Sequence, residues 1–384
     1  MTEEMDNIVV LTDEDGNEVQ FEHVVTVTHK NKEYVCLIPI EGIDYGEDED
    51  ENALIFLEIL PGKNGEEDVY QGVEDEKLLN ELYAKYLEAV EFEDDEDILV
   101  IEMTSDDAWI RDCGPTFVVN DDGDVRAVHW HFNSWGGLVD GLYFPWDQDA
   151  LVGCKVSDLA RAVRYRPDDF VLEGGSIHVD GEGTVLTTEM CLLSEGRNPD
   201  LTKEQIEDYL KEYLGIEKVL WIKDGIDPEE TNGHIDDVAC FVRPGEVACI
   251  WTDDEDNPFY EAAHAAYDTL SNATDAKGRQ LKVHKLTMPK VPTYMTQEEV
   301  DAIDVVEGTL PRTVDDVCIA SYMNFLIVNG AVILPQYDDE YDELAVKQVQ
   351  EMFPDHEVVG VPTREVAYGG GNIHCITQQQ PAGK

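Results

Sequence analysis

The sequence predicts an α/β protein in which similar modules of strands and helices are arranged around an axis, preceded by a small acidic α+β unit. Three observations support this fold class. The motif Gly174 to Val179 recurs with two changes as Gly370 to Cys375. From residue 98 onward, four segments share one plan of strand, tight turn, strand, acidic loop, helix and strand. The density of acidic residues also falls sharply near residue 97.

The acidic residues set the boundary between the two parts. The 384 residues have a formal net charge of −59, and residues 1–97 hold 31 Asp and Glu against 5 Lys and Arg. The other 287 residues hold 54 acidic and 21 basic side chains, so we expect an acidic module at 1–96 and a second domain at 97–384. A field of this sign repels nucleic acid and anionic membranes and attracts cationic partners. An acidic surface that only keeps the protein soluble also explains the composition.

The acidic module is expected to combine short strands with one helix. Apolar runs separated by turn-forming residues predict strands at 7–11, 24–27, 34–40 and 54–60. An amphipathic helix is expected at 74–92, because apolar residues recur three and four positions apart at Leu78, Leu79, Leu82, Tyr83, Tyr86 and Leu87. The apolar run Ile98 to Met103 is expected to form a further strand.

The four similar segments of the second domain follow one another at regular intervals. Each contains one helix, expected near 156–162 and at 203–213, 261–270 and 343–353. The segments run from Thr116 to Ala162, Ser176 to Ile222, Val238 to Leu286 and Asn324 to Val361. Polar residues at the start of each first strand are expected to point toward the common axis, where residues from distant parts of the chain would meet.

Cysteine usage and hydropathy indicate the compartment. The eight cysteines are scattered, without a Cys-x-x-Cys pair or the spacing of a metal finger. This pattern favours reduced, mostly buried thiols in a cytoplasmic protein. The sequence shows neither a secretory signal nor an apolar run of membrane-spanning length. We therefore expect a soluble and unexported protein.

The starts of the modules contain an unusual set of residues. They are Trp109 to Asp112, Glu173 to Gly175, Asn232 to Asp236 and Gly369 to Cys375, the last expected to begin a strand. One cysteine, one histidine and several carboxylates are the residues that thiol catalysis with a positioned base requires. Taken singly, each has an ordinary structural interpretation, such as a buried thiol for Cys375 or a salt-bridge carboxylate for Asp112. His178 and His374, at matching repeat positions, are expected to be structural.

Five stretches of the second domain resemble the agmatine deiminase family. They are residues 106–117 (DDAWIRDCGPTF), 135–147 (WGGLVDGLYFPWD), 173–180 (EGGSIHVD), 232–236 (NGHID) and the closing GGGNIHCITQQ. The resemblance extends over about residues 97–384, and the related bacterial peptidylarginine deiminases share only the sparse catalytic residues. It implies a pentein-type fold, a five-fold pseudosymmetric α/β propeller with the active site on its axis.

The resemblance also implies a role for each site residue. Cys375 would be the nucleophile and His234 the general acid and base, with Glu173 supporting His234 or the substrate nitrogens. The substrate guanidinium would be clamped by Asp112 and Asp236, which would fix a planar cation by paired hydrogen bonds. The substrate pocket would be lined by Trp109, Gly370 and Gly371.

The implied reaction is hydrolysis of agmatine to N-carbamoylputrescine and ammonia through a covalent amidino-cysteine, a step of putrescine biosynthesis. No metal or organic cofactor is implied, and a homo-oligomer is compatible with the resemblance. Two other functions stay open. The chain can act on peptidylarginine or another guanidine, or it can be a weakly active fusion whose acidic module serves binding or solubility.

The sequence departs from the family mainly at its front. Glu229 stands where the family usually has Asp, and Asp237 where Asn is common. The family's own N-terminal segment, with its Trp-Pro and Arg-Pro-Asp-Asn-Trp motifs, has no counterpart, and the first tryptophan is Trp109. Residues 1–97 instead resemble the small acidic YrzB-like proteins of unknown function, on the stretches 7–18 and 32–35. We expect the helix at 74–92 and the strand at 98–103 to complete the fifth module, with the alternative that this helix stays within the acidic module.

Overall fold

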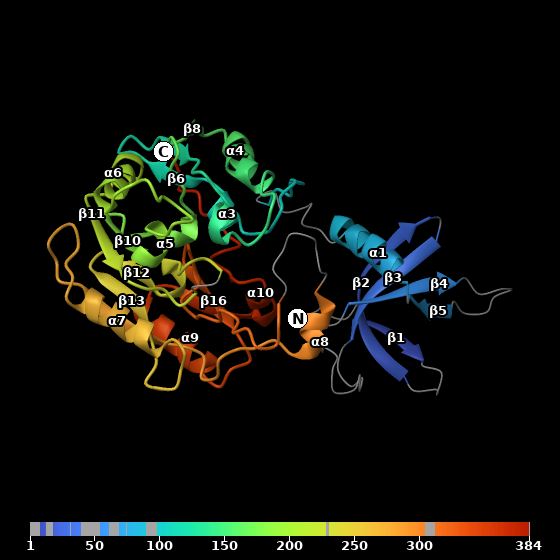
Figure 1. Ribbon diagram of the computed structural model, residues 1–384. Coiled ribbons are helices and arrows are strands. Elements are labelled where there is room, and N and C mark those ends of the chain that lie inside the picture. The colour runs from blue at the N-terminus through green and yellow to red at the C-terminus, as the bar shows by residue number, and fades with distance from the viewer. Residues whose placement is uncertain are drawn as a thin grey trace. The chain divides into compact units, whose positions relative to one another are not determined.

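The computed structural model of the chain contains two compact units, Met1–Met103 and Thr104–Lys384 (Figure 1). The structure describes residues 8–12, 18–30, 32–39, 54–60, 69–73, 75–89, 98–227, 230–303 and 312–383. The change in charge density near residue 97 therefore lies six residues before the boundary between the units. None of the described helices is long and apolar enough to cross a membrane.

The described residues of the first unit form an antiparallel sheet with one helix packed against it (Figure 1). Its five strands follow chain order as β1 (Ile8–Thr12), β2 (Glu18–His29), β3 (Lys32–Pro39), β4 (Ile55–Leu60) and β5 (Val69–Gly72). Each of the four predicted strands overlaps one of β1 to β4, while β5 was not predicted. The predicted ends at residues 7 and 40 lie outside the described residues. The predicted helix is present as α1 (Glu76–Ala89).

The apolar side of α1 is buried within its own unit. Leu82 is fully buried in a cluster with Val27, Tyr34, Cys36 and Phe56, and Leu78, Leu79 and Tyr86 pack against the same cluster. The alternative that this helix stays within the acidic module is therefore confirmed.

The strand predicted at Ile98 to Met103 is wrong, because these residues have no regular secondary structure. Leu99 is 80% exposed and Val100 is 77% exposed. An apolar run forms a strand only where a neighbouring strand offers its backbone hydrogen bonds, and no described strand pairs with these residues. Neither element expected to complete the fifth module is therefore placed as predicted.

The described residues of the second unit form four three-stranded sheets built on the same plan. In each sheet the first two strands are antiparallel and the last two are parallel. The strands are β6 (Thr116–Val119), β7 (Val125–Val128) and β8 (Val163–Tyr165); β9 (His178–Val179), β10 (Thr184–Thr188) and β11 (Lys218–Ile222); β12 (Ala239–Arg243), β13 (Glu246–Trp251) and β14 (Lys282–Thr287); and β15 (Leu326–Val328), β16 (Ala331–Gln336) and β17 (Glu357–Pro362). This arrangement confirms the α/β class and the four-module repeat.

A helix connects the second and third strands of every module, as a parallel pair requires. These helices are α4 (Asp149–Leu159), α6 (Lys203–Leu214), α7 (Tyr260–Ser271) and α9 (Asp342–Met352). The boundaries of α6 are encoded locally. Thr202 and Gln205 form a capping box at its start, and Gly215, with a φ of +68°, ends it. The fifth module of the pentein propeller stays a prediction, since the described residues of this unit form four.

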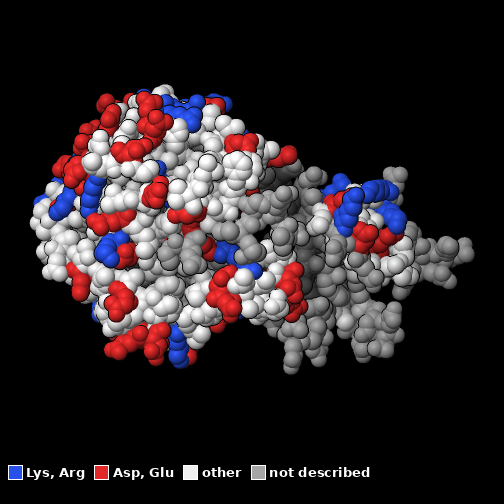
Figure 2. All heavy atoms as spheres, viewed as in Figure 1, with Lys and Arg blue, Asp and Glu red and all other residues white. Residues whose placement is uncertain are grey.

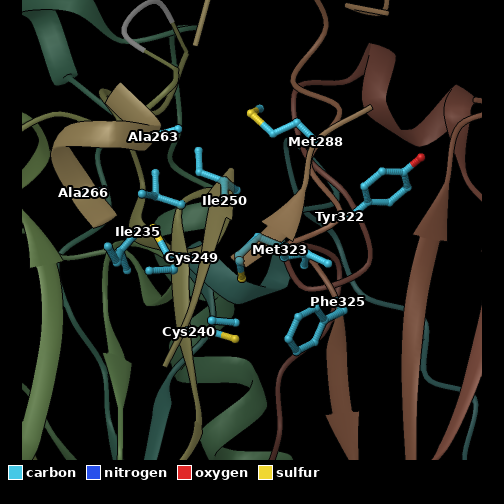
Figure 3. Close-up of a cluster of buried hydrophobic side chains, with 14 of the residues drawn as sticks. Ile235, Cys240, Cys249, Ile250, Ala263, Ala266, Met288, Tyr322, Met323 and Phe325 are labelled. Atoms are coloured by element: carbon cyan, nitrogen blue, oxygen red, sulfur yellow. The ribbon is translucent and has the colours of Figure 1, made fainter. Parts of the chain in front are cut away.

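The core of the second unit lies between the sheets and their helices. Figure 3 shows Cys249 and Ile250 of β13 beside Ala263 and Ala266 of α7, four residues that are essentially inaccessible to solvent. Small side chains on α7 let the helix approach the sheet closely. Cys240 and Cys249 are free thiols in this core, as expected for reduced, buried cysteines.

Short helical turns stand before the first strands of three modules, and five of the eight predicted site residues lie in these turns or immediately before them. They are α2 (Ile110–Cys113), η1 (Gly174–Ser176) and η2 (Ile235–Asp237). The remaining short helices are α3 (Gly137–Asp140), α5 (Glu189–Leu192), α8 (Gln297–Ala302) and α10 (Arg364–Tyr368). Cys375 lies in a turn after α10, so the strand expected at this residue is wrong. A turn replaces it because none of the described strands pairs with residues 371–383.

Candidate active site

Three modules bring their predicted site residues together around Gly175. A β-carbon on this glycine would lie 2.6 Å from His234 Nδ1 and 2.9 Å from both Asp112 Oδ1 and Asp236 Oδ2. Asp112 comes from α2, Gly175 from η1, and His234 and Asp236 from the start of η2. All of these residues are buried. Gly175 has no side chain, so a space remains beside it that is bordered by one imidazole and two carboxylates.

His234 lies among three carboxylates. Its Nδ1 is 3.9 Å from Asp112 Oδ2 and 4.0 Å from Asp236 Oδ1, and its Nε2 is 3.9 Å from Glu173 Oε2. Burial lowers the pKa of His234, but the negative charges of Asp112 and Glu173 outweigh burial and hold this pKa well above its ordinary value. This shift favours the protonated imidazole, and neither ring nitrogen has a hydrogen-bond partner among the described residues.

Glu173 is held by a buried arginine. Arg197 Nε donates to Glu173 Oε1 at 2.7 Å, and both side chains are completely buried. Arg197 Nη2 also donates to the carbonyl of Thr231 at 2.9 Å, and the hydroxyl of Thr231 accepts from the His234 amide at 3.1 Å. Burial raises the pKa of Glu173, but the Arg197 charge lowers it below its ordinary value overall. Arg197 thus connects Glu173 to the loop that carries His234.

Asp112 and Asp236 have opposite pKa shifts although they border the same space. Asp112 accepts hydrogen bonds from the Gly175 amide and from Trp135 Nε1, each at 2.9 Å. Burial raises its pKa to about 6. Burial also acts on Asp236, but His374 Nδ1 lies 2.8 Å from Asp236 Oδ2, and this hydrogen bond brings the pKa of Asp236 below its ordinary value. Asp236 is therefore the more firmly ionised carboxylate.

The thiol of Cys375 lies between Asp236 and Asn324. Its Sγ is 3.5 Å from Asp236 Oδ2 and 3.2 Å from Asn324 Nδ2. Burial, followed by the negative charges of Asp236 and Asp237, raises the pKa of Cys375 well above its ordinary value. This shift favours the neutral thiol, whose proton lies within reach of the Asp236 carboxylate.

Trp109, Gly370 and Gly371 form one side of the site. A β-carbon on Gly371 would lie 2.6 Å from Trp109 Cζ3 and 3.0 Å from Cys375 Cβ, so the indole lies beside the thiol. Gly370 has a φ of +95°, a conformation that favours glycine, and lies against the side chain of Glu230. The structure thus places all eight predicted site residues in one region.

Several residues of this site were not predicted as site residues. Asn324 begins the fourth module, and the rule that placed polar residues at the other module starts would have found it. His374 was expected to be structural, and its contact with Asp236 is a positioning role. Trp135 begins the family-like stretch 135–147, whereas Arg197 had no such signal, and their partners lie 23 and 24 residues away in the sequence.

One group of donor atoms has the spacing of a metal site. The ligand atoms of Glu173, Cys191 and His234 lie within 4.8 Å of one another. Arg197 is already bonded to Glu173 at 2.7 Å, and its guanidinium supplies the charge balance that a metal ion would provide. We therefore assign no ion to this group.

Comparison with known proteins agrees with this geometry. The family model described as Porphyromonas-type peptidyl-arginine deiminase matches residues 46–381. A Streptococcus mutans protein, described provisionally as an agmatine deiminase, is 71% identical over 285 residues, which are 74% of this chain and 77% of that protein. The agmatine deiminase of Pseudomonas aeruginosa is 56% identical over 289 residues, 75% of this chain and 78% of that protein.

A solved structure extends the likeness to three dimensions. The agmatine deiminase of Enterococcus faecalis, described as catalysing its reaction, superposes with a TM-score of 0.73 at 65% identity. The superposition covers 75% of this chain and 78% of the Enterococcus chain. These matches confirm the resemblance predicted for the second domain, and they show that the chain belongs to the Porphyromonas-type peptidyl-arginine deiminase family, among the agmatine deiminases.

Proposed function

We propose that the chain hydrolyses the guanidinium group of agmatine to N-carbamoylputrescine and ammonia through a covalent amidino-cysteine. The observation that carries this proposal is the Cys375 thiol beside Asp236, on the border of a space that is also lined by Asp112 and His234. Relatives of known structure that are named agmatine deiminases share most of this chain, which supports agmatine as the substrate.

Asp112 and Asp236 would bind the substrate guanidinium in the space beside Gly175. A guanidinium is planar and cationic, so a pair of carboxylates fixes its orientation through charge-assisted hydrogen bonds. Asp236 Oδ1 has no hydrogen-bond partner among the described residues and is free to accept one. The arriving cation would also offset the negative charges that oppose ionisation of Cys375.

Cys375 would then attack the central carbon of the guanidinium. Its proton would pass to Asp236, and the new carbon–sulfur bond would give a tetrahedral intermediate. Protonated His234 would donate to a departing nitrogen, so that ammonia leaves and an amidino-thioether remains. His234, now neutral, would take a proton from the attacking water. The carbon–sulfur bond would then break as Asp236 returns its proton to the departing sulfur, and the released ammonia would take the proton of the new hydroxyl group, which leaves N-carbamoylputrescine, ammonium and the thiol.

Glu230 is a candidate for recognising the far end of agmatine, which carries a primary ammonium. One oxygen of Glu230 is paired with Arg312, and the other has no partner among the described residues. The side chain lies against Gly370, next to the glycine that contacts Trp109 and Cys375. A carboxylate here attracts an ammonium and repels the carboxylate of free arginine, which favours agmatine over arginine.

The first unit is the other part of the proposal. We propose that residues 1–96 are a separate acidic module, related to the YrzB-like proteins, followed by an agmatine-deiminase-like domain at 97–384 that lacks the family's usual front segment. The cluster around Leu82 in the first unit supports this proposal, because the acidic module buries apolar residues of its own. The proposal further includes a cytoplasmic location and a homo-oligomer. Its partner is a cationic small molecule and not nucleic acid. The strong negative charge agrees with the choice of partner.

Ammonia release from three substrates tests the function. Purified chain would be given agmatine, free arginine or an arginine peptide with both ends blocked, with Cys375→Ala as the control. We expect release from agmatine at a kcat/KM at least about tenfold above the other two, and none from the variant. Release from the blocked peptide alone would instead establish a peptidylarginine deiminase. Release from none of them would establish an inactive fusion.

A further inference from the structure

Asn324 directs its whole amide group at the residues around the thiol. It is fully buried and lies two residues before the start of β15. Its Nδ2 lies 3.2 Å from Cys375 Sγ and 3.0 Å from Asp237 Oδ1. Its Oδ1 accepts from the backbone amides of His374 at 3.0 Å and Cys375 at 3.3 Å. Both donors and the oxygen of this amide are therefore used.

The orientation of the Asn324 amide is determined by these partners. Two backbone N–H groups can only donate, so the atom that faces them must be the oxygen. The nitrogen then faces Cys375 Sγ and Asp237. Exchanging the two atoms would place N–H groups against N–H groups, at a cost that no other contact offsets. An N–H group therefore points at the sulfur.

The sulfur has few other groups that stabilise negative charge. Its nearest carboxylate is Asp236, and Asp112 and Asp237 also oppose a charge on the sulfur. Asn324 is the only described side chain that donates a hydrogen bond to it. Donors gain strength when their acceptor becomes an anion, so this bond is stronger to a thiolate than to a thiol.

We propose that Asn324 is a catalytic residue, which positions the Cys375 sulfur and stabilises its thiolate through an N–H···S hydrogen bond. The same bond acts twice in the reaction. It supports the thiolate when Cys375 gives up its proton before the carbon–sulfur bond forms, and again when hydrolysis expels the sulfur. Asn324 itself gains and loses no proton. The proposal rests on the proposed function only for the identity of these two steps.

Alkylation of Cys375 by iodoacetamide tests the proposal without any substrate. The thiolate attacks the reagent and iodide leaves, so the rate reports the fraction of thiolate. Modification of the peptide that contains Cys375 would be followed by mass spectrometry between pH 7 and 10. In Asn324→Asp, an oxygen replaces the donor at the same size, and we expect alkylation at pH 8 to slow by about 10- to 100-fold.

Asn198→Asp is the matched control. Asn198 is also buried and uses both ends of its amide, accepting from the Val171 amide at 3.0 Å and donating to the Val171 carbonyl at 2.9 Å. It has no contact with the thiol, so its variant should lose stability while Cys375 keeps the native alkylation profile. Asn324→Ala, which removes the donor without adding a charge, covers the case in which Asn324→Asp does not fold.

Two results would overturn the proposal. One is a folded Asn324 variant whose Cys375 alkylation profile is native, because the residue would then be structural. The other is an equal slowing in Asn198→Asp, which would assign the effect to general loosening of the fold. Because the assay contains no guanidine, a failure of agmatine hydrolysis leaves both results interpretable.

Discussion

The first unit has the denser negative charge. Among the residues whose burial is described, however, every buried charged or polar side chain belongs to the second unit. In the first unit, acidic side chains such as Glu58 pair at the surface with lysines, while the interior is apolar. In the second unit, Figure 2 shows acidic side chains spread over the visible face, but Asp112, Glu173 and Asp236 lie inside. Charge density therefore does not locate the chemistry, whereas buried charge does, because a charge is removed from water only where other interactions compensate it.

The buried thiols give the largest expected contrast between the units. Cys36 in the first unit and Cys375 in the second are both buried, and burial raises the pKa of Cys36 to about 12. We expect Cys375→Ser to lower kcat at least about 1000-fold, because the nucleophile is lost. Cys36→Ser should leave kcat unchanged, as steady-state ammonia release would show. A Cys375→Ser enzyme with half of the native rate would remove the assignment of the nucleophile.

Glycines give the next contrast. A β-carbon on Gly175 would meet His234, Asp112 and Asp236 within 2.9 Å, whereas one on Gly72 in the first unit would meet nothing within 4 Å. Gly175→Ala should lower kcat/KM by about 100-fold or more, since the methyl group would occupy the space that the substrate needs. Gly72→Ala should be neutral. Native kinetics in Gly175→Ala would show that the substrate binds elsewhere.

Asp112→Asn separates activity from stability. The folded pKa of about 6 lies above the ordinary value of 3.8, so the native protein loses stability as pH rises from about 4 through 6. The variant lacks this loss but leaves one of two hydrogen-bond donors, Gly175 or Trp135, unpaired. At pH 7 its free energy of unfolding should therefore stay within about 1–2 kcal/mol of native, while turnover falls steeply.

Urea unfolding at pH 4.5 and pH 7 measures the pH effect in Asp112→Asn. The difference in unfolding free energy, variant minus native, should be more favourable to the variant at pH 7 than at pH 4.5. The opposite order would mean that Asp112 is stabilised as an ion in the native protein.

Ion pairs contrast the two units in stability. The substitution Arg197→Met would leave Glu173 as an unpaired buried charge, so the unfolding free energy of the second unit should fall by about 3–5 kcal/mol. The pair Lys32–Glu58 in the first unit lies at the surface, and Lys32→Met should leave stability unchanged within error. Chemical denaturation of both variants checks the pair of outcomes. Equal losses of unfolding free energy in the two variants would show that burial does not distinguish the two ion pairs.

The smallest effect on turnover is expected from the core of the first unit. Leu82→Ala should destabilise that unit by about 2–5 kcal/mol, because it removes a fully buried side chain. Turnover of agmatine should nevertheless be native, since the site residues all belong to Thr104–Lys384. A proportional loss of kcat in this variant would mean that the acidic module supports the active site.

The sequence predicted the modules well because their signals are local. Helix α6 and strand β11 begin at the predicted residues, since a capping box, a glycine stop and apolar spacing lie within each element. The strands expected at Ile98 to Met103 and at Cys375 failed for a common reason. A strand is completed by a partner, and local apolar character does not show whether a partner is available.

The sequence by itself determined the candidate residues for the chemistry, because Cys375, His234 and the carboxylates lie in continuous motifs that are recognisable residue by residue. Only the tertiary structure decided their ionisation and support. Arg197 reaches Glu173, Trp135 reaches Asp112, and His374 reaches Asp236 across 138 residues. Burial shifts the pKa of Asp112, while Arg197 and His374 lower the pKa values of Glu173 and Asp236. Burial and charge both depend on which distant segments meet, a property that no local pattern contains.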